Sequence, residues 1–568
     1  MPTAGAAAAP KVYVYPIPGA RVASPETQIA FRGIAPSMFG AITVTGSMSG
    51  VHDGTVKADS DGRGGSFLPA TPFTPGETVS VQTSLKIVGT KNGTFTFKVA
   101  TPGGVFPSAH WRIAPRVSGD IWQFHSRPDL APAATQIVRR GRTASGDIFV
   151  APQFGPLQDG PEILDSNGQL VWFKSLRGND SAADLRVQSY HGQPVLTWWQ
   201  GYVAAGIGVG VDVINDASYR QIAVIHAANG LSADLHEFQL TPSGTALIVA
   251  QYPIYVDASS VHLSTHRLVL DSVVQEIDIQ TGLVLFQWDS LDHVPLTDTY
   301  EPRPQHSYTP YDYFHANSIA VDHDHNLVIS ARNTWAAYKV NRHTGAIIWR
   351  LGGKHSSFRL APGVHWAFQH DVRIRANNDW FMTLFDDGGA PPKVESQSRG
   401  LKLFVDLRHM TVKQVGNHPH VPLLSTNFEG NYQQLFNGDD FLGWGQQPYF
   451  TEYDSRGNLI FDGRFVDGNA SYRAWRFAWN GTPTTQPAIA AVRNGGSTVV
   501  YASWNGATNV ASWRVLGGGT VGGLTQVGRA RRSGFETAIT VSSHSFVQVQ
   551  ALDSGGNVLS TSTTLQVT

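Results

Sequence analysis

The sequence has 568 residues, no cysteine and a balanced charge, with 42 lysines and arginines against 43 aspartates and glutamates. At roughly 100–200 residues per domain, this length predicts several domains. The balanced charge argues against nucleic acid or an anionic membrane as a partner, and the lack of cysteine excludes disulfides, thiolate metal sites and a cysteine nucleophile. No stretch approaches the roughly 18 consecutive apolar residues of a membrane-spanning helix.

The chain begins with residues 1–10, which lack the basic and apolar segments of an intact secretory signal. We interpret them as a linker or a trimmed terminus. Residues 11–106 contain short runs rich in valine, isoleucine and phenylalanine between glycine and proline turns. This pattern is typical of strands, and the segment is predicted to be an N-terminal β-sandwich.

Residues 107–483 contain a repeated pattern, in which Asp or Asn opens a turn and Gly precedes an apolar strand. Clear copies start at Asp165, Asp278, Asn341 and Asp454, and degenerate copies start near Asn215 and Asp406. Six copies of this kind favour a six-bladed β-propeller, in which each four-stranded sheet buries both faces against its neighbours. The predicted fold class is therefore all-β.

Residues 484–568 repeat the rhythm of the N-terminal segment, with runs such as Val499–Trp504, Ala511–Leu516 and Phe546–Ala551. They are predicted to form a fibronectin type III or similar immunoglobulin-like β-sandwich. Within them, Gly517–Gly522 has the letters of a dinucleotide-binding fingerprint. No helix is expected after it, so it is interpreted as a hairpin loop.

Histidine provides the strongest indication of a functional site. The chain has 21 histidines and no Walker loop, G-x-S-x-G elbow or zincin pair. Polar segments containing His236, His315, Arg332 and His370 lie near strand boundaries in consecutive repeats. Propeller geometry would bring such segments to one central funnel.

This pattern supports more than one interpretation. Any one of these histidines could instead satisfy backbone groups of a neighbouring blade. Together with Asn317 and Arg332 they suit the binding of a tetrahedral oxyanion, and a histidine-rich zinc or copper site is the competing hypothesis. Asp371, next to His370, is predicted to bind backbone groups rather than to orient an imidazole. The cluster Asp322–Asn326 is predicted to be a turn rather than a metal site.

Several of these segments closely resemble the arylsulfotransferase (arylsulfate sulfotransferase) family across about residues 107–483. The matching segments are Leu235–Phe238, Tyr311–Ile319, Leu327–Arg332, Thr344–Lys354, Phe368–Asp371, Thr383–Gly388 and Gly443–Gln446. The resemblance implies an enzyme that moves a sulfuryl group from an aryl sulfate to a phenol without phosphoadenosine phosphosulfate. It also implies that no metal or other cofactor takes part.

The resemblance further implies roles for individual residues. His370 matches the covalent nucleophile, and His236, His315, Asn317 and Arg332 match residues that hold the sulfuryl oxygens and manage protons. Neutral His370 would form a sulfohistidine, which predicts ping-pong kinetics. His236 or His315 would exchange protons with the phenols, and the sequence does not assign which.

The expected partners are an aryl sulfate donor and a phenolic acceptor, with no nucleic acid and no membrane span. The resemblance places the protein outside the cytoplasm, secreted or at the cell surface, and the flanking modules are expected to serve attachment or assembly of a homodimer. Three alternatives stay open: a divergent family member acting on another small-molecule ester, a quinone- or metal-dependent redox propeller, and a non-catalytic surface-binding propeller.

Overall fold

The computed structural model describes residues 11–104, 117–153, 158–375, 378–466 and 468–568. Its regular structure is almost entirely β-strand, which confirms the predicted all-β class. Among the described residues, no helix combines the length and the hydrophobicity that crossing a membrane would require. The helices are α1 (Ser290–His293) and the short 3-10 helices η1 (Pro36–Met38), η2 (Ser259–Val261), η3 (Leu296–Asp298) and η4 (Val521–Gly523).

The middle of the chain forms sheets that we number 1 to 6. Sheet 1 contains β11 (Asp147–Pro152), β12 (Glu162–Leu164), β13 (Leu170–Phe173) and β35 (Ser471–Phe477); sheet 2 contains β14 (Ser181–Tyr190), β15 (Gln193–Ala204), β16 (Ile207–Asn215) and β17 (Gln221–Ile225); sheet 3 contains β18 (Phe238–Leu240), β19 (Thr245–Val256), β20 (Arg267–Asp278) and β21 (Val284–Asp289). Sheet 4 contains β22 (Ala316–Val321), β23 (Leu327–Ala331), β24 (Ala336–Val340) and β25 (Ile347–Gly352); sheet 5 contains β26 (Arg359–Leu360), β27 (His370–Arg375), β28 (Asn378–Asp386), β29 (Arg399–Asp406) and β30 (Thr411–Pro419); sheet 6 contains β10 (Thr135–Arg140), β31 (Asn431–Gln434), β32 (Asp440–Gly443), β33 (Tyr449–Tyr453) and β34 (Leu459–Phe465).

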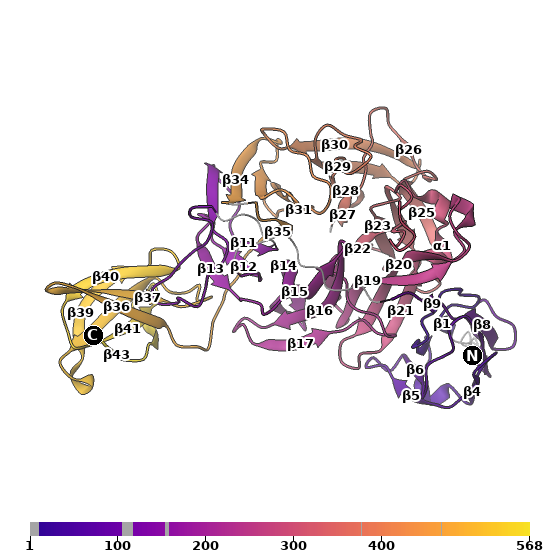
Figure 1. The fold of residues 1–568 in the computed structure, drawn as a ribbon, viewed down its shortest axis with the longest axis horizontal. Coiled ribbons are helices and arrows are strands. Elements are labelled where there is room, and N and C mark those ends of the chain that lie inside the picture. The colour runs from indigo at the N-terminus through magenta and orange to yellow at the C-terminus, as the bar shows by residue number, and fades with distance from the viewer. Residues whose placement is uncertain (1–10, 105–116, 154–157, 376–377, 467) are drawn as a thin grey trace, which may run out of the picture.

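These sheets follow one another around a common centre (Figure 1). Contacts between β14 and β18, β19 and β22, β22 and β27, β27 and β31, and β31 and β35 join each sheet to the next, and β14 contacts β11 and β35. Sheet 1 completes the circuit with strands from both ends of the central segment, because β35 pairs with β11. The ring is therefore closed by main-chain hydrogen bonds between residues more than 300 positions apart.

Both faces of the central sheets are buried, as their sequences require. The neighbouring residues Trp198 and Trp199 on β15 point to opposite faces, yet they are 0% and 1% exposed. Trp198 packs with Trp172 of sheet 1, whereas Trp199 packs with Phe238 of sheet 3. Stacking of adjacent sheets thus accounts for much of the tryptophan content.

The repeated turns found in the sequence join the third strand to the fourth strand of each sheet, counted from the centre; in sheets 5 and 6 a fifth strand, β26 or β10, lies outside the fourth. In every turn an Asp or Asn side chain accepts a hydrogen bond from a main-chain N–H two residues later, as in an Asx turn. The accepting residues are Asp165, Asp216, Asp278, Asn341, Asp406 and Asp454. Near the degenerate copies, Tyr219 and Met410 have positive φ angles of 66° and 50°, the conformation that glycine supplies elsewhere, as at Gly168 and Gly457.

The N-terminal segment forms two sheets around one apolar core, which includes Val14, Phe31, Val44, Val81 and Phe97. One sheet has β1 (Tyr13–Tyr15), β2 (Ile29–Arg32), β5 (Gly54–Ala58) and β6 (Gly64–Pro69); the other has β3 (Ile42–Gly46), β4 (Gly50–His52), β7 (Thr78–Thr83) and β8 (Thr94–Lys98). The following strand, β9 (Thr101–Pro102), pairs with β19. This pairing attaches the segment to sheet 3.

The C-terminal segment also forms two sheets around its own core, including Val500, Trp513 and Val549. One has β36 (Ala488–Asn494), β37 (Ser497–Ser503) and β40 (Glu536–Ser542); the other has β38 (Ser512–Gly518), β39 (Thr525–Arg531), β41 (Phe546–Leu552), β42 (Val558–Thr561) and β43 (Leu565–Gln566). The predicted hairpin loop at Gly517–Gly522 joins β38 to β39, as expected. The segment contacts sheet 1, where Asn505 hydrogen-bonds the main chain of Phe173, and it lies at the opposite end of the molecule from the N-terminal segment (Figure 1).

Candidate active site

A cavity of about 300 Å³ lies at the inner ends of the central sheets. Four of the predicted site residues line it: His236, His315, Arg332 and His370. They come from the loop before β18, the residue before β22, the residue after β23 and the first position of β27. The remaining lining residues are Gln153, Val203, Ala205, Gly206, Leu235, Asp312, Phe428 and Glu429.

The tautomer of His370 follows from its neighbours. Its Nδ1 lies 3.1 Å from the main-chain oxygen of Phe368 and 2.7 Å from Oδ2 of Asp387. A carbonyl oxygen can only accept, so Nδ1 carries the hydrogen. The main-chain N–H of Glu429 points at Nε2 from 3.4 Å, which assigns the lone pair of the ring to Nε2. His370 lines the cavity, so this lone pair can serve chemistry there once it gives up the N–H of Glu429.

The electrostatic surroundings keep His370 neutral. Burial lowers the pKa of His370 well below its usual value, and the charge of Arg332 lowers it further. Burial also raises the pKa of Asp387 well above its usual value, although its hydrogen bond from the Thr426 hydroxyl and the charge of Arg332 oppose this. An unprotonated imidazole, held by fixed partners on Nδ1, is the form a nitrogen nucleophile needs.

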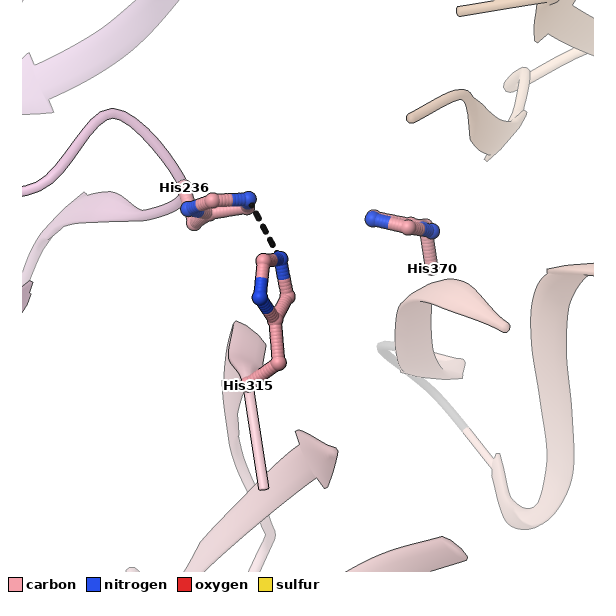
Figure 2. A group of neighbouring side chains, drawn as sticks. All are labelled: His236, His315 and His370. Atoms are coloured by element: carbon pink, nitrogen blue, oxygen red, sulfur yellow. Dashed lines mark hydrogen bonds between the residues drawn. The ribbon is translucent and has the colours of Figure 1, made fainter. Parts of the chain in front are cut away.

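His236 and His315 form a pair opposite His370 (Figure 2). Their Nε2 atoms are 3.0 Å apart, while each Nδ1 bonds a carboxylate, Asp234 for His236 and Asp312 for His315. Two nitrogens that share a hydrogen bond need one hydrogen between them, so the pair holds one imidazolium. Burial lowers the pKa of His236. Burial opposes ionisation of Asp312, but the adjacent His315 outweighs it and lowers the pKa of this carboxyl.

Arg332 adds a second cation to the cavity. Its Nη1 donates to Oδ1 of Asn333 at 2.6 Å and its Nη2 to the main-chain oxygen of Asn427 at 2.9 Å. The guanidinium carbon is 4.8 Å from the centre of the Phe368 ring. Within the described part of the chain, Nε of Arg332 is buried and has no partner, which leaves a donor available for a ligand in the cavity.

The fifth predicted residue, Asn317, is not among the residues that line the cavity. It lies on β22, where its Nδ2 donates to the main-chain oxygen of Gln369 at 2.7 Å. Its own main-chain oxygen accepts from Tyr472 and Arg473. In this structure Asn317 positions the chain directly before His370, whereas the sequence had suggested contact with the sulfuryl oxygens.

The three imidazoles have nitrogen atoms within 4.8 Å of one another, close enough to consider a shared metal ion. Two features favour an anion in the same space. Arg332 places a permanent cation in the cavity wall, and the hydrogen bond between His236 and His315 requires a proton where a metal would need two free lone pairs.

Comparison with known proteins identifies a family for the central part of the chain. The family model for arylsulfotransferase (ASST) matches residues 186–466, a stretch that contains all five predicted site residues. This part of the chain belongs to the arylsulfotransferase family. A search of curated proteins finds no match.

Solved structures give weaker similarities. The chain is similar to a protein of unknown function from Bacteroides caccae, with 12% identity, a TM-score of 0.35, and coverage of 58% of this chain and 98% of that one. It is also similar to a catalytically inactive virginiamycin B lyase from Staphylococcus aureus, with 8% identity, a TM-score of 0.29, and coverage of 64% and 95%. A protein from Lactobacillus plantarum has 10% identity, a TM-score of 0.32, and coverage of 75% and 97%. These scores assign neither a fold nor an activity.

The sequence analysis missed the carboxyl groups of the candidate site. Asp234 and Asp312 stand two and three residues before the histidines that they contact, and this short spacing was an available signal. Asp387 is 17 positions from His370 and reaches it only because β27 pairs with β28. No signal in the sequence pointed to Glu429.

Below the cavity, buried charges occupy the inner ends of the strands. Arg473 of β35 pairs with Asp184 at 2.9 Å and with Glu237 at 3.4 Å. Arg373 pairs with Glu237 at 2.6 Å and with Asp371 at 2.7 Å. Asp371 also accepts from the main-chain N–H of Tyr432, which confirms its predicted backbone-binding role. This ionic cluster joins strands from four sheets beneath the histidines.

Proposed function

We propose that this protein transfers a sulfuryl group from an aryl sulfate to a phenol, independently of phosphoadenosine phosphosulfate, through a covalent intermediate on His370. The observation that carries the proposal is the unprotonated Nε2 of His370, held by Phe368 and Asp387 beside a cavity with cationic walls. Membership of the arylsulfotransferase family supports the general activity.

In the proposed complex, the sulfate ester lies between the cations and the nucleophile. Arg332 holds the non-bridging oxygens by charge-assisted hydrogen bonds, and the positive charge of the His236–His315 pair attracts the same oxygens without a direct hydrogen bond. Nε2 of His370 attacks sulfur in line with the aryl oxygen. The S–O bond to the aryl group breaks, its electron pair leaves with the aryl oxygen, and a sulfohistidine remains.

The second half of the reaction reverses the first. An acceptor phenol enters the space that the first phenol has left, and its oxygen attacks the sulfur of the sulfohistidine. The S–N bond breaks, and its electron pair returns to Nε2 of His370. Because donor and acceptor use the same cavity in turn, the kinetics are ping-pong.

The proposal includes an architecture. Sheets 1 to 6 are the blades of a six-bladed β-propeller covering residues 107–483, and the pairing of β35 with β11 supports it as the closure between the two ends. The flanking segments, residues 11–106 and 484–568, are an N-terminal β-sandwich and a fibronectin type III or immunoglobulin-like sandwich. Their two-sheet cores support this assignment. We also propose that the protein acts outside the cytoplasm.

The experiment is a transfer assay with intact-mass analysis. Purified protein mixed with 4-nitrophenyl sulfate and no acceptor should gain the mass of one SO₃ group, and added phenol should discharge it as phenyl sulfate. His370→Ala should lose both the adduct and at least about 10³-fold of the transfer rate, because the nucleophile is removed.

The matched control is His355→Ala, which changes a histidine whose side chain is 61% exposed and which lies outside the cavity. This variant should keep the adduct and the transfer rate of the unchanged protein. The proposal would be abandoned if the unchanged protein formed neither adduct nor product, or if His370→Ala were sulfated as readily as the parent.

A further inference from the structure

Glu429 is a titratable residue of the cavity with no role in the mechanism above. It lies in the loop before β31 with a φ angle of 73°, a left-handed conformation that is uncommon for glutamate. The neighbouring chain packs closely around this residue. A Cβ at Gly445 would lie 2.5 Å from the carbonyl carbon of Glu429, and one at Gly430 would lie 2.5 Å from the Phe385 ring. Backbone strain at a cavity wall often accompanies function.

The carboxyl group of Glu429 has an unusual environment. The residue is 8% exposed and lines the same cavity as the three histidines. Within the described residues, its Oε2 is buried without a hydrogen-bond partner. Burial raises the pKa of Glu429 to about 8. At neutral pH the group is therefore mostly a neutral carboxylic acid, which an anionic substrate can approach without charge repulsion.

The histidine pair is poorly arranged to donate to a phenol. Both Nδ1 atoms are engaged with carboxylates, and both Nε2 atoms are engaged with each other. Releasing the shared proton would remove the cation that holds the sulfuryl oxygens. Glu429, by contrast, has an unengaged carboxyl oxygen, and its own N–H lies 3.4 Å from the nitrogen that attacks sulfur. The backbone at Glu429 thus lies beside the reacting atoms.

We propose that Glu429 is the acid and base of the transfer, and that the enzyme therefore accepts sulfates of weakly acidic phenols. This inference rests on the proposed function. It assigns to a carboxyl group the proton transfer that the sequence left open between His236 and His315.

The protons and electrons balance over the two steps. When the S–O bond breaks, the aryl oxygen takes its electron pair and receives the proton of Glu429, which yields a phenol and the Glu429 carboxylate. The anionic charge of the sulfate ester thus passes to Glu429, while the sulfohistidine is a neutral zwitterion. The acceptor phenol then gives its proton to the carboxylate as its oxygen attacks sulfur, and Nε2 of His370 recovers its lone pair.

The test compares two donors that need the acid to different degrees. 4-Nitrophenolate leaves readily without a proton, whereas the phenolate from phenyl sulfate needs one. Glu429→Gln should slow formation of the sulfuryl adduct from phenyl sulfate roughly 10²–10⁴-fold, the usual contribution of general acid catalysis. With 4-nitrophenyl sulfate, the rate of adduct formation by the same variant should stay within about fivefold of the rate of the parent. The donor ratio, which is the rate with 4-nitrophenyl sulfate divided by the rate with phenyl sulfate, should therefore increase.

Two further variants separate catalysis from folding. Glu162→Gln is the matched control, because Glu162 on β12 is also buried, with neither carboxyl oxygen bonded within the described residues, and lies outside the cavity. It should leave the donor ratio unchanged. If Glu429→Gln does not fold, Glu429→Gly removes the carboxyl while suiting the left-handed backbone, and it should show the same selective loss with phenyl sulfate.

The outcomes distinguish this proposal from the previous one. Equal loss with both donors, or no loss with either, would overturn the role of Glu429 while leaving sulfuryl transfer intact. A parent protein that forms no adduct with either donor would overturn the proposed function and the acid–base role together. A donor ratio that changes equally in Glu162→Gln would also count against Glu429.

Discussion

The outer turns of the central sheets and the inner ends of the same sheets are built differently. At the rim, Asx turns recur at the fourth strand of each sheet, and an aspartate or asparagine fixes each of them. At the centre, the strand ends carry groups of several kinds. Left-handed backbones occur there at His315, Phe368 and Glu429, which lie outside the strands, and at Asp184 and Asp371, which lie on β14 and β27.

This difference shows where the fold tolerates change and where it does not. Each rim turn is local to one hairpin, so the loss of one turn weakens that hairpin and leaves the other turns unaffected. The central groups depend on one another: Asp387 orients His370, His236 shares a proton with His315, and the ionic cluster supports them from below. Substitutions at the centre should therefore have larger effects than those at the rim.

The largest effect is expected for Asp387→Asn. Asparagine can present an N–H to Nδ1 of His370, which favours the tautomer that carries hydrogen on Nε2 and blocks attack. By comparison with His–Asp pairs in hydrolases, kcat/KM should fall roughly 10³–10⁴-fold. The measurement is steady-state kinetics with 4-nitrophenyl sulfate and phenol. For Asp406→Asn, in a rim turn, kcat/KM should stay within about twofold of the parent value. An equal loss of kcat/KM in the Asp406 and Asp387 variants would contradict the proposed difference between the rim and the centre.

The second prediction concerns the ionic cluster. Arg473 is fully buried among Asp184, Glu237 and Asp371, so Arg473→Leu removes one buried cation that these carboxylates share and leaves them only Arg186 and Arg373. The free energy of unfolding should fall by about 3–5 kcal/mol, measured by urea denaturation. Arg220→Leu removes an arginine with a 77% exposed side chain that pairs with Asp216 at the rim, and it should cost less than about 1 kcal/mol. If Arg473→Leu and Arg220→Leu lowered the free energy of unfolding by similar amounts, burial of the ion pairs would not explain their contribution to stability.

A smaller effect is expected for Asp454→Ala at the rim. This change removes the acceptor of main-chain hydrogen bonds from Arg456 and Asn458 at 3.0 and 2.8 Å. Stability should fall by about 1 kcal/mol, with kcat/KM unchanged, and Asp454→Asn should recover most of the loss because its side-chain oxygen can still accept. Thermal denaturation together with the transfer assay provides the check. A large loss of activity without loss of stability would contradict the separation of rim and centre.

The smallest change is expected on mild acidification. The pKa of His370 lies well below its usual value, because the ring is buried and Arg332 is close. His370 therefore stays unprotonated as the pH falls through the usual histidine range, and attack is lost only once the pH falls through its lower pKa. Between about pH 7.5 and pH 6, kcat/KM for 4-nitrophenyl sulfate should change less than about twofold. A steady tenfold loss per pH unit from about 6.5 would indicate an ordinary imidazole.

The rim was the part of the fold most accessible from sequence. Each turn needs an acceptor side chain and a left-handed residue within a few positions, so local sequence determines it. Asp165, Asp278, Asn341 and Asp454 mark their turns directly. In the turn at Asp406 the left-handed position is held by Met410. The folded structure holds Met410 in a conformation that glycine usually adopts. The sequence repeat at Asp406 therefore lacks the expected glycine and was recognised only as a degenerate copy.

The site could be predicted only in part. His236, His315, Arg332 and His370 were found because polar residues at strand ends of successive repeats converge in a ring, and the structure brings these four to one cavity. The predicted contact of Asn317 with the sulfuryl oxygens stays a prediction, and in the structure its side chain donates to the main chain of Gln369 instead of lining the cavity. Glu429 could not be found from sequence, because its raised pKa depends on burial by residues that are distant along the chain.

The pairing of β35 with β11 has a consequence for how the molecule matures. A ribosome makes β11 early and β35 more than 300 residues later, so the nascent chain cannot close the ring of sheets until β35 has been made. This strand brings Tyr472, whose hydroxyl donates to the main chain of His236, and Arg473, which pairs with Asp184. The pocket is therefore incomplete on every nascent chain that ends before β35, and any reaction that depends on it has to wait for this strand.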